Sequence, residues 1–336
     1  MKKNVILFVA LVVSAGLAFG QGNVSNVTST GADHEAFVNQ TGVTNQADII
    51  QTGTSNYAWQ YQNGTSNEAL IQQAGADNSA YQYQWGTTNL ARVNQLSAVS
   101  GNLAYQQQYG TSNNAYAVHY VTNNISFQYQ SGNENAAVAD LLGNLNYSVQ
   151  NQFGNSNYAI SFVTGDENLA YQTQSGEGNA ASVEQTGDHN RSTQLQYGDL
   201  NQAVVQQGVY SGLTEAFSNE ARQYQFGTSN SATANQLGES NYAEQLQGIN
   251  RVYNDEGDVF WYEYDDDPTA NNVALINQDG IDNEALQAQH GEGGNIATTS
   301  QTGSLNEAST EQFGSLHNST ITQTGTGNFA HVVQNN

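Results

Sequence analysis

The clearest pattern in the chain is an alternation of inward-type and outward-type residues that restarts every eleven positions. Asn45, Ala47, Ile49 and Gln51 occupy alternate positions, so they lie on one face of an extended strand. The stretch "GTSN" that begins at Gly53 then interrupts the alternation, because glycine permits positive φ and asparagine tolerates it. We therefore predict a unit of seven extended residues and a four-residue turn.

The middle position of the unit carries a second, longer period. It alternates between a small or apolar residue and glutamine, as in Ile49, Gln60, Ile71 and Gln82. The structural repeat is therefore two units, which is two strands and two turns in about 22 residues. We predict an all-β fold: a flattened β-solenoid of stacked two-strand rungs in two parallel sheets, with about a dozen rungs.

Side-chain sizes predict how the two strands of a rung pack together. If the strands fold back on each other, Ile49 faces Ala58 and Ala47 faces Gln60, so large residues oppose small ones. Rungs stacked about 4.8 Å apart would let identical amides bond to one another in a cross-β-like ladder. The predicted ladder positions are Asn45, Ala47, Ile49, Gln51, Asn56, Ala58, Gln60, Gln62, Asn67, Gln73, Asn78, Gln84, Asn157, Gln174, Asn179 and Gln185. The predicted turn glycines are Gly42, Gly53, Gly64, Gly75, Gly86, Gly132, Gly154, Gly176, Gly187 and Gly227.

An outward column of aromatic residues stands at the middle of alternate strands. Its members are Trp59, Tyr81, Tyr105, Phe127 and Tyr171. Aromatic residues suit β-strands and stack between neighbouring rungs, which is one interpretation of this exposed column. The other interpretation is an adhesive stripe for lateral bundling or for attachment to a surface.

The first twenty residues predict that the chain is exported from the cell. Residues 1–20, "MKKNVILFVALVVSAGLAFG", have the charged start, apolar run and small-residue end of a signal peptide, with cleavage expected between Gly20 and Gln21. The chain has no cysteine, so disulfides do not stabilise it. The formal charge is −24, and after cleavage Arg92, Arg191, Arg222 and Arg251 would be its only Lys or Arg residues. This charge excludes binding to nucleic acid through phosphate neutralisation.

Two segments break the period, and we expect irregular loops near residues 208–218 and 249–271 within a repeat domain that spans residues 21–336. The second segment holds Pro268 and an acidic cluster between Asp255 and Asp267. The cluster could hold Ca²⁺, but it lacks the glycine-punctuated spacing of a calcium loop. A solvated acidic loop is the favoured interpretation.

The titratable residues predict no catalytic, cofactor or metal site. Three histidines substitute within ladders, His34 and His317 in asparagine slots and His119 in a glutamine slot, whereas His290 and His331 should point outward. No pair has metal-ligand spacing such as His-Glu-x-x-His. Many acidic residues fall in turns and do not converge on a pocket, as paired general acids and bases must; they include Asp33, Asp77, Glu134, Asp166, Glu177, Asp188, Asp199 and Glu239. We therefore expect neither enzyme activity nor a small-molecule substrate.

The repeat resembles the curlin repeat of curli fibre subunits. The resemblance rests on the order Gln40-x-Gly42-x-x-Asn45-x-Ala47-x-x-x-Gln51 and on its many later copies. It implies a bacterial extracellular functional amyloid that forms homopolymer fibres for adhesion and biofilm matrix. It also implies two partners, an outer-membrane pore for export and a nucleator subunit. Whether this chain is a major subunit or a nucleator stays open.

The repeat continues to both ends of the sequence, from Asn23 to the last residues. Monomeric solenoids generally protect their terminal rungs with capping elements, so uncapped rungs favour polymerisation. There are two alternatives to a fibre subunit. One is a monomeric β-solenoid adhesin at the cell surface. The other is a polysaccharide-cleaving solenoid enzyme, which would need converging carboxylates.

Overall fold

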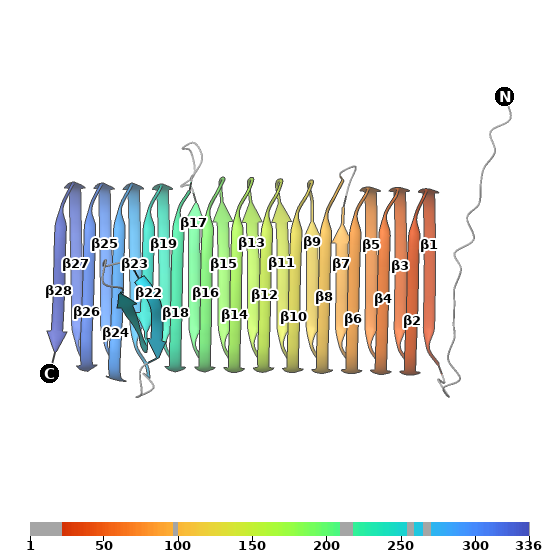
Figure 1. Cartoon of the computed structure of the whole chain (residues 1–336), viewed down its shortest axis with the longest axis horizontal. Helices are drawn as coiled ribbons and strands as arrows, with labels where there is room; N and C mark the ends of the chain where they lie inside the picture. The colour runs from red at the N-terminus through yellow and green to blue at the C-terminus, as the bar shows by residue number, and fades with distance from the viewer. Residues whose placement is uncertain (1–21, 97–99, 209–217, 254–258, 265–269, 336) are drawn as a thin grey trace, which may run out of the picture.

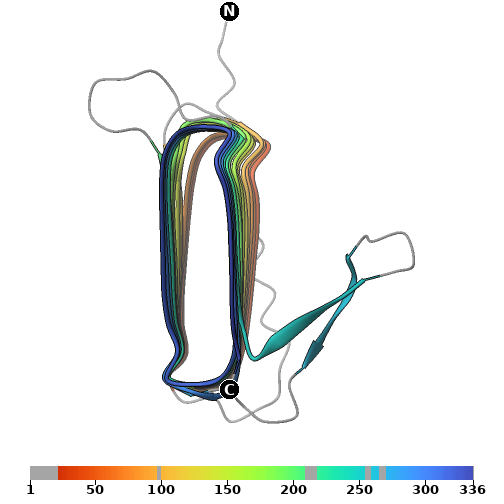
Figure 2. The same ribbon diagram turned by 90° about the vertical axis from the view of Figure 1, so that its left-hand side faces the viewer.

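The computed structural model describes residues 22–96, 100–208, 218–253, 259–264 and 270–335. In this part of the chain every regular element is a β-strand. Two 13-stranded parallel sheets contain all but two of these strands, and they run the length of an elongated body (Figure 1). Seen along that axis, the rungs superpose as one flattened ring (Figure 2). The predicted β-solenoid of about 22 residues per rung is confirmed, with 13 rungs.

Odd-numbered and even-numbered strands separate into the two sheets, because each turn carries the chain from one sheet to the other. Sheet A contains β1 (Val24–Ala32), β3 (Gln46–Thr54), β5 (Glu68–Ala76), β7 (Leu90–Gln95), β9 (Asn114–His119), β11 (Ala136–Leu142), β13 (Tyr158–Thr164), β15 (Ala180–Thr186), β17 (Gln202–Gly208), β19 (Ser231–Glu239), β23 (Val273–Ile281), β25 (Ile296–Ser304) and β27 (Asn318–Thr326). Sheet B contains β2 (Glu35–Val43), β4 (Tyr57–Thr65), β6 (Ser79–Thr87), β8 (Leu103–Thr111), β10 (Ile125–Asn133), β12 (Tyr147–Asn155), β14 (Leu169–Glu177), β16 (Arg191–Asp199), β18 (Glu220–Thr228), β20 (Tyr242–Gln247), β24 (Glu284–Gly293), β26 (Glu307–Ser315) and β28 (Phe329–Asn335).

The strands are longer than the seven residues expected from the sequence. Many span nine residues, because pairing with the next rung continues through the glycine and the residue after it, as in Gly53↔Gly75 and Thr54↔Ala76. The corner itself is short. Ser55 has φ 53° and the next strand begins at Tyr57.

The turn glycines have a second role that the sequence alone does not reveal. Gly132 has φ 123°, which suits a glycine, but a Cβ there would also lie 1.9 Å from the carbonyl oxygen of Gly154 in the next rung. Gly42 and Gly53 meet the glycine of the next rung in the same way, at 2.0 and 1.9 Å. A side chain at these corners would therefore separate adjacent rungs.

The core is a thin layer of small and large residues between the sheets. Ile49, Ala58 and Ile71 belong to one buried cluster, which ends at Ala117. A second cluster begins at Leu141. The division falls where the middle slots of sheet A become small, at Ala117, Ala139 and Ser161.

The two segments that break the period interrupt the solenoid differently. Most of the first, residues 209–217, lies outside the described residues. The second was expected to be irregular, but it contains an antiparallel hairpin of β21 (Ile249–Tyr253) and β22 (Val259–Tyr264). The hairpin projects beside sheet B (Figure 2), next to β18 and β24. The solenoid then resumes in register, since β20 pairs directly with β24.

Candidate functional site

One column of glutamines runs through every rung of sheet B. Each glutamine donates a hydrogen bond from Nε2 to Oε1 of the glutamine in the next rung, at 2.8–3.0 Å. The members are Gln40, Gln62, Gln84, Gln108, Gln130, Gln152, Gln174, Gln196, Gln225, Gln247, Gln289, Gln312 and Gln334. The same Nε2 also donates to a backbone carbonyl of sheet A, as Gln62 does to Gln46 at 2.8 Å. All these amides point the same way, so the column has a direction.

A second column of sheet B is shorter at both ends. It begins at Gln60, whose Nε2 donates to Gln82 at 2.9 Å, and it continues to Gln287. The first rung carries Val38 in this slot, and the buried Oε1 of Gln60 accordingly has no hydrogen-bond partner. The last rung carries Val332. The middle slots of both end rungs are therefore apolar.

The glutamine column of sheet A is interrupted. Gln51, Gln73 and Gln95 bond in series, and a second series begins at Gln185. The intervening slots hold His119, Leu141 and Val163. Because valine cannot donate, the buried Oε1 of Gln185 has no partner.

His119 begins this interruption as a fully buried imidazole. Its Nε2 lies 2.9 Å from the Ser126 hydroxyl, and its Nδ1 has no partner. Burial lowers the pKa of His119 to about 3, so the ring is neutral at physiological pH.

The asparagine columns connect the corners from rung to rung. The Oδ1 of Asn45 accepts the backbone N–H of Asn67 and one of its side-chain N–H groups, both at 3.1 Å. The Nδ2 of Asn45 donates to Thr41 and Gly64 carbonyls. Each asparagine thus satisfies corner carbonyls as well as its neighbour in the column.

The structure places the predicted ladder residues on the inner faces of both sheets. The following are essentially inaccessible to solvent: Asn45, Ala47, Ile49, Gln51, Asn56, Ala58, Gln60, Gln62, Asn67, Gln73, Asn78, Gln84, Asn157, Gln174, Asn179 and Gln185. The predicted turn glycines have positive φ at the corners: Gly42, Gly53, Gly64, Gly75, Gly86, Gly132, Gly154, Gly176, Gly187 and Gly227.

The aromatic column lies on the outer face of sheet B, but it is half-buried and not exposed as expected. Trp59, Tyr81, Tyr105, Phe127 and Tyr171 are each shielded by neighbours in adjacent rungs. The Tyr81 and Tyr105 ring centroids are 6.2 Å apart, and those of Tyr105 and Phe127 are 6.0 Å apart. Stacking of the rings on one another covers much of their surface.

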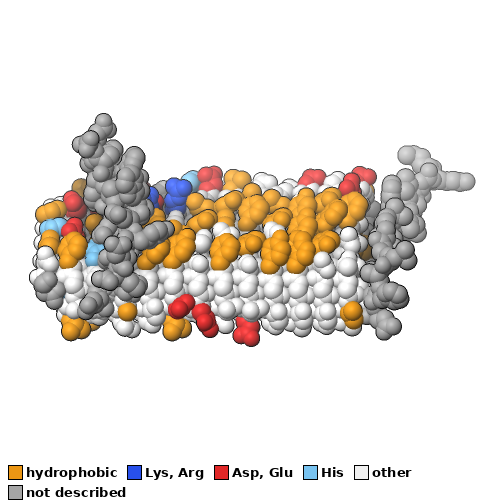
Figure 3. All heavy atoms as spheres, turned by 60° about the horizontal axis from the view of Figure 1, so that its bottom comes forward, with side chains coloured by type: hydrophobic (Ala, Val, Ile, Leu, Met, Phe, Trp, Pro, Cys, Tyr) orange, Lys and Arg blue, Asp and Glu red, His pale blue; other side chains and the backbone are white. Residues whose placement is uncertain are grey.

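Two further aromatic rows on this face were not recognised in the sequence. One contains Tyr61, Tyr83, Tyr129 and Tyr224; the other contains Trp85, Tyr109, Phe153, Tyr197, Phe226 and Phe313. Figure 3 shows hydrophobic side chains gathered in rows along this face. The outward slots in the described strands of sheet A hold far fewer aromatic residues: Tyr116, Tyr158 and Phe162. The outer faces of the two sheets therefore differ strongly in aromatic content. This difference could have been predicted from the sequence by comparing every outward position of alternate strands.

The C-terminal part of the sheet B outer face is covered. Glu244 and Leu246 stand in outward slots, yet both are buried. His290 stands in an outward slot, as expected, but it is only 6% exposed and its ring stacks on Phe313 with centroids 5.0 Å apart. The neighbouring strand β21 lies beside this region.

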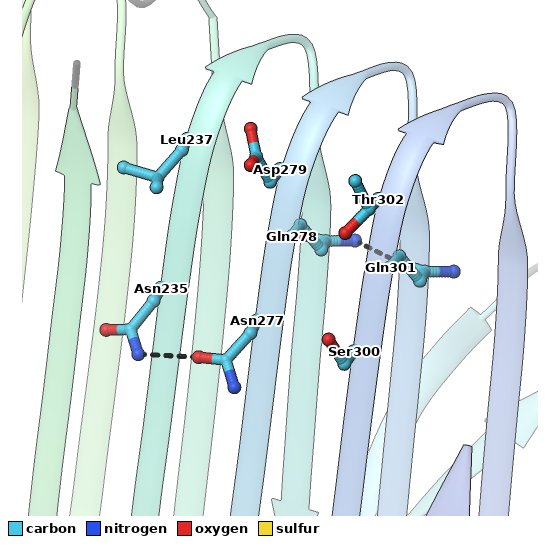
Figure 4. A pocket seen from close by; sticks show the side chains of 8 residues that line it. All are labelled: Asn235, Leu237, Asn277, Gln278, Asp279, Ser300, Gln301 and Thr302. Carbon is cyan, nitrogen blue, oxygen red and sulfur yellow. Dashed lines mark hydrogen bonds between the residues drawn. The ribbon is translucent and has the colours of Figure 1, made fainter. Parts of the chain in front are cut away.

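The described residues offer no evident site for a small ligand or a metal. No group of three or more His, Asp or Glu side chains there is placed to hold a metal ion. A shallow recess of about 100 Å³ lies between β19, β23 and β25, where Asn235 donates to Asn277 at 2.8 Å (Figure 4). Typical ligand pockets are about 300–1,000 Å³. In the same part of the chain, no helix has the length and apolar character needed to cross a membrane.

Comparison with known proteins agrees with the repeat geometry. The chain matches the curlin associated repeat at residues 44–75, 165–193 and 294–325, which fall near the beginning, the middle and the end of the solenoid. No curated protein matches the chain. Curlin proteins are structural fibre subunits and not an enzyme family. The three matches support assignment of this repeat solenoid to the curlin family.

Proposed function

We propose that this chain is a secreted subunit that assembles end to end into curli-type amyloid fibres. The observation that carries the proposal is the directional glutamine column from Gln40 to Gln334. At one edge of the described solenoid Gln40 presents its Oε1, which is the acceptor in every later rung. At the other edge Gln334 presents its Nε2, which is the donor in every earlier rung. A second copy stacked on either edge would extend the column.

The two end rungs also match each other residue by residue. If β27 of one copy pairs with β1 of the next in the register used inside the chain, Ile321 meets Val27 and Gly325 meets Gly31. On sheet B, Val332 meets Val38. These middle slots hold glutamine in most rungs of sheet B, so the valines leave no buried amide without a partner at an open edge. Burial of these side chains would favour stacking.

The cellular role follows from the same proposal. Export would begin with removal of residues 1–20, a segment outside the described residues, and would continue through an outer-membrane pore. The polymer would then contribute to adhesion and to the biofilm matrix outside the cell. The curlin repeat matches support this assignment, and a nucleator subunit is the expected partner for the first step.

The test is assembly of the mature chain, from Gln21 onward, in the absence of any partner. We expect fibres after a lag that preformed seeds abolish, with a meridional reflection near 4.7–4.8 Å. Persistently monomeric protein with a β-rich circular dichroism spectrum would contradict the proposal.

That second outcome would favour a monomeric surface adhesin, which the aromatic rows of sheet B support. Rows of half-buried rings along one face form a flat apolar surface of the kind that binds partners. The two functions are separable by experiment. Replacement of Phe153 and Tyr197 by serine would weaken surface attachment but leave end-to-end growth intact.

A further inference from the structure

Both histidines that replace asparagine in the corner columns lie in the end rungs. His34 occupies this slot in the first rung and His317 occupies it in the last, while every rung between them has asparagine at both corners in the part of the chain described. The slots are structurally equivalent: the backbone N–H of Asn67 bonds to Asn45 in the same way that the N–H of Asn56 bonds to His34.

The hydrogen bonds of His34 fix its tautomer. Its Nε2 lies 3.1 Å from the carbonyl oxygen of Thr30, which only accepts, so Nε2 carries the proton. Its Nδ1 lies 3.3 Å from the backbone nitrogen of Asn56, which only donates, so Nδ1 is unprotonated. The neutral ring therefore imitates an asparagine: Nε2–H stands for Nδ2–H and Nδ1 stands for Oδ1.

His317 has the same arrangement at the opposite edge. Its Nε2 lies 2.8 Å from the Phe313 carbonyl oxygen, four residues earlier, just as His34 contacts Thr30. Its backbone N–H donates to Oδ1 of Asn295 at 2.9 Å, which continues the asparagine column. In the neutral ring Nε2 carries the proton, so Nδ1 is an acceptor. By analogy with the asparagines of the column, Nδ1 would face the backbone N–H of the next rung.

We propose that His317 makes the junction between copies sensitive to pH, by accepting the backbone N–H of Asn23 of the next copy only while its imidazole is neutral. The inference rests on the end-to-end assembly proposed above. Protonation would put a hydrogen on Nδ1, opposite the N–H of Asn23, and two donors would face each other. His34 acts at the other edge, because its protonation opposes the bond from Asn56 and loosens the first rung.

Among the side chains that the structure describes, few other charged groups surround this junction. β27 and β1 carry no Asp, Glu, Lys or Arg, and on β28 the one titratable side chain is His331, in an outward slot. His290 stacks on Phe313 from the preceding rung of the same sheet. Asp33 and Glu35 of the next copy would lie at the opposite corner of the rung, and Glu311 is in an outward slot of β26. The mature amino terminus, proposed at Gln21, is two residues from Asn23 and would add positive charge. No anion in this set lies in the column to stabilise a protonated His317.

The experiment is seeded elongation of the mature chain between pH 7.5 and 5.5, with seeds in excess so that nucleation is bypassed. This pH range spans the pKa of about 6.5 of a model imidazole. We expect the elongation rate of the wild-type chain to fall about tenfold, relative to His317→Asn, over this range. Asparagine supplies the same acceptor without a charge. The His34→Asn variant should show a smaller gain at acidic pH.

His189→Asn is the matched control, because His189 lies in a corner in the middle of the solenoid, 3.1 Å from Glu167. It should follow the wild-type profile. Equal pH profiles for wild type and His317→Asn would overturn the inference while fibre growth itself stands. Absence of fibres at every pH would instead contradict the proposed function.

Discussion

In both sheets, columns of inward-facing side chains connect the stacked rungs, but the two sheets have different residues in these columns. In sheet B a glutamine occupies one inward slot in all 13 rungs, and each amide bonds to the next. In sheet A the corresponding column changes to His119, Leu141 and Val163 before glutamine returns. The change leaves the Oε1 of Gln185 and the Nδ1 of His119 without partners and places a titratable ring in the core. An amide column is therefore stable as a continuous series, and each break has a local cost.

The sheet A interruption is matched by changes on the facing strands. Ser126 and Ser148 replace the alanine found in the equivalent slot of most rungs, and the middle slots opposite them are Ala117 and Ala139. Only Ser126 gains a partner, since it bonds to His119, whereas the buried hydroxyl of Ser148 has none. The hydroxyl of Ser126 thus replaces one of the hydrogen bonds that the interrupted column loses. Single substitutions can measure how much each part of the interruption lowers the free energy of unfolding.

Breaking the continuous column should have the largest effect. Gln130→Ala removes the bonds to Gln108 and Gln152, so the Oε1 of Gln152 and one N–H of Gln108 lose their partner, and it opens a cavity. We expect the free energy of unfolding to fall by about 3–5 kcal/mol in a guanidinium titration. Gln72→Ala is the control, because Gln72 is exposed on sheet A, and it should change that free energy by less than about 0.5 kcal/mol. Similar losses in both variants would refute the structural role of the column.

The titratable ring of sheet A should make the folded chain sensitive to acid. The pKa of His119 is about 3 in the folded state against about 6.5 unfolded, so the unfolded chain binds the proton first. Its contribution is complete above pH 6.5 and is lost as the pH falls toward 3. At pH 4 the loss is about 3 kcal/mol. His119→Gln should remove it, and denaturant titrations of both chains at pH 7 and pH 4 measure the difference. An unchanged pH dependence would contradict the burial of a neutral ring.

The two serines should respond in opposite directions. Ser126→Ala removes the partner of His119 and should lower the free energy of unfolding by about 1 kcal/mol. Ser148→Ala removes a buried hydroxyl without a partner and should raise that free energy by about 1 kcal/mol. Both variants are compared with the wild type by thermal unfolding at pH 7. Shifts of the same sign would show that these hydroxyls are not distinguished by their bonding.

The smallest effect is expected on the outer face of the interruption. Partial burial raises the pKa of Asp140, so its charged form opposes folding at neutral pH. The proton is bound more tightly in the folded state, and the penalty therefore disappears as the pH falls below the raised value. Asp140→Asn should stabilise the chain at pH 7 by less than about 1 kcal/mol, and it should lose that advantage near pH 3. Stabilisation that persists unchanged at pH 3 would point to another cause.

The period of the sequence was sufficient to predict the rungs, because strand alternation, corner glycines and column amides all repeat with it. The sequence predicts only one of the two reasons for glycine at position 132. A turn with positive φ is a local feature, but the Gly154 carbonyl that excludes a side chain belongs to the next rung. The hairpin β21–β22 was not predicted because it lies where the period is absent. The burial of His290 and Leu246 was also not predicted, because the alternation along a strand shows that a residue faces outward but not what packs against it.

End-to-end stacking is tested most directly by joining the two end rungs covalently. The chain has no cysteine, so Asn39→Cys and Val333→Cys together introduce the only thiols. These outward slots would be adjacent across the junction, about 4.8 Å apart, which is within disulfide range. Mild oxidation of fibres of this variant should give a ladder of covalent oligomers on a non-reducing denaturing gel. An Asn39→Cys and Phe153→Cys control should give no such ladder. Monomers alone from the first variant, in fibres that formed normally, would contradict the end-to-end account.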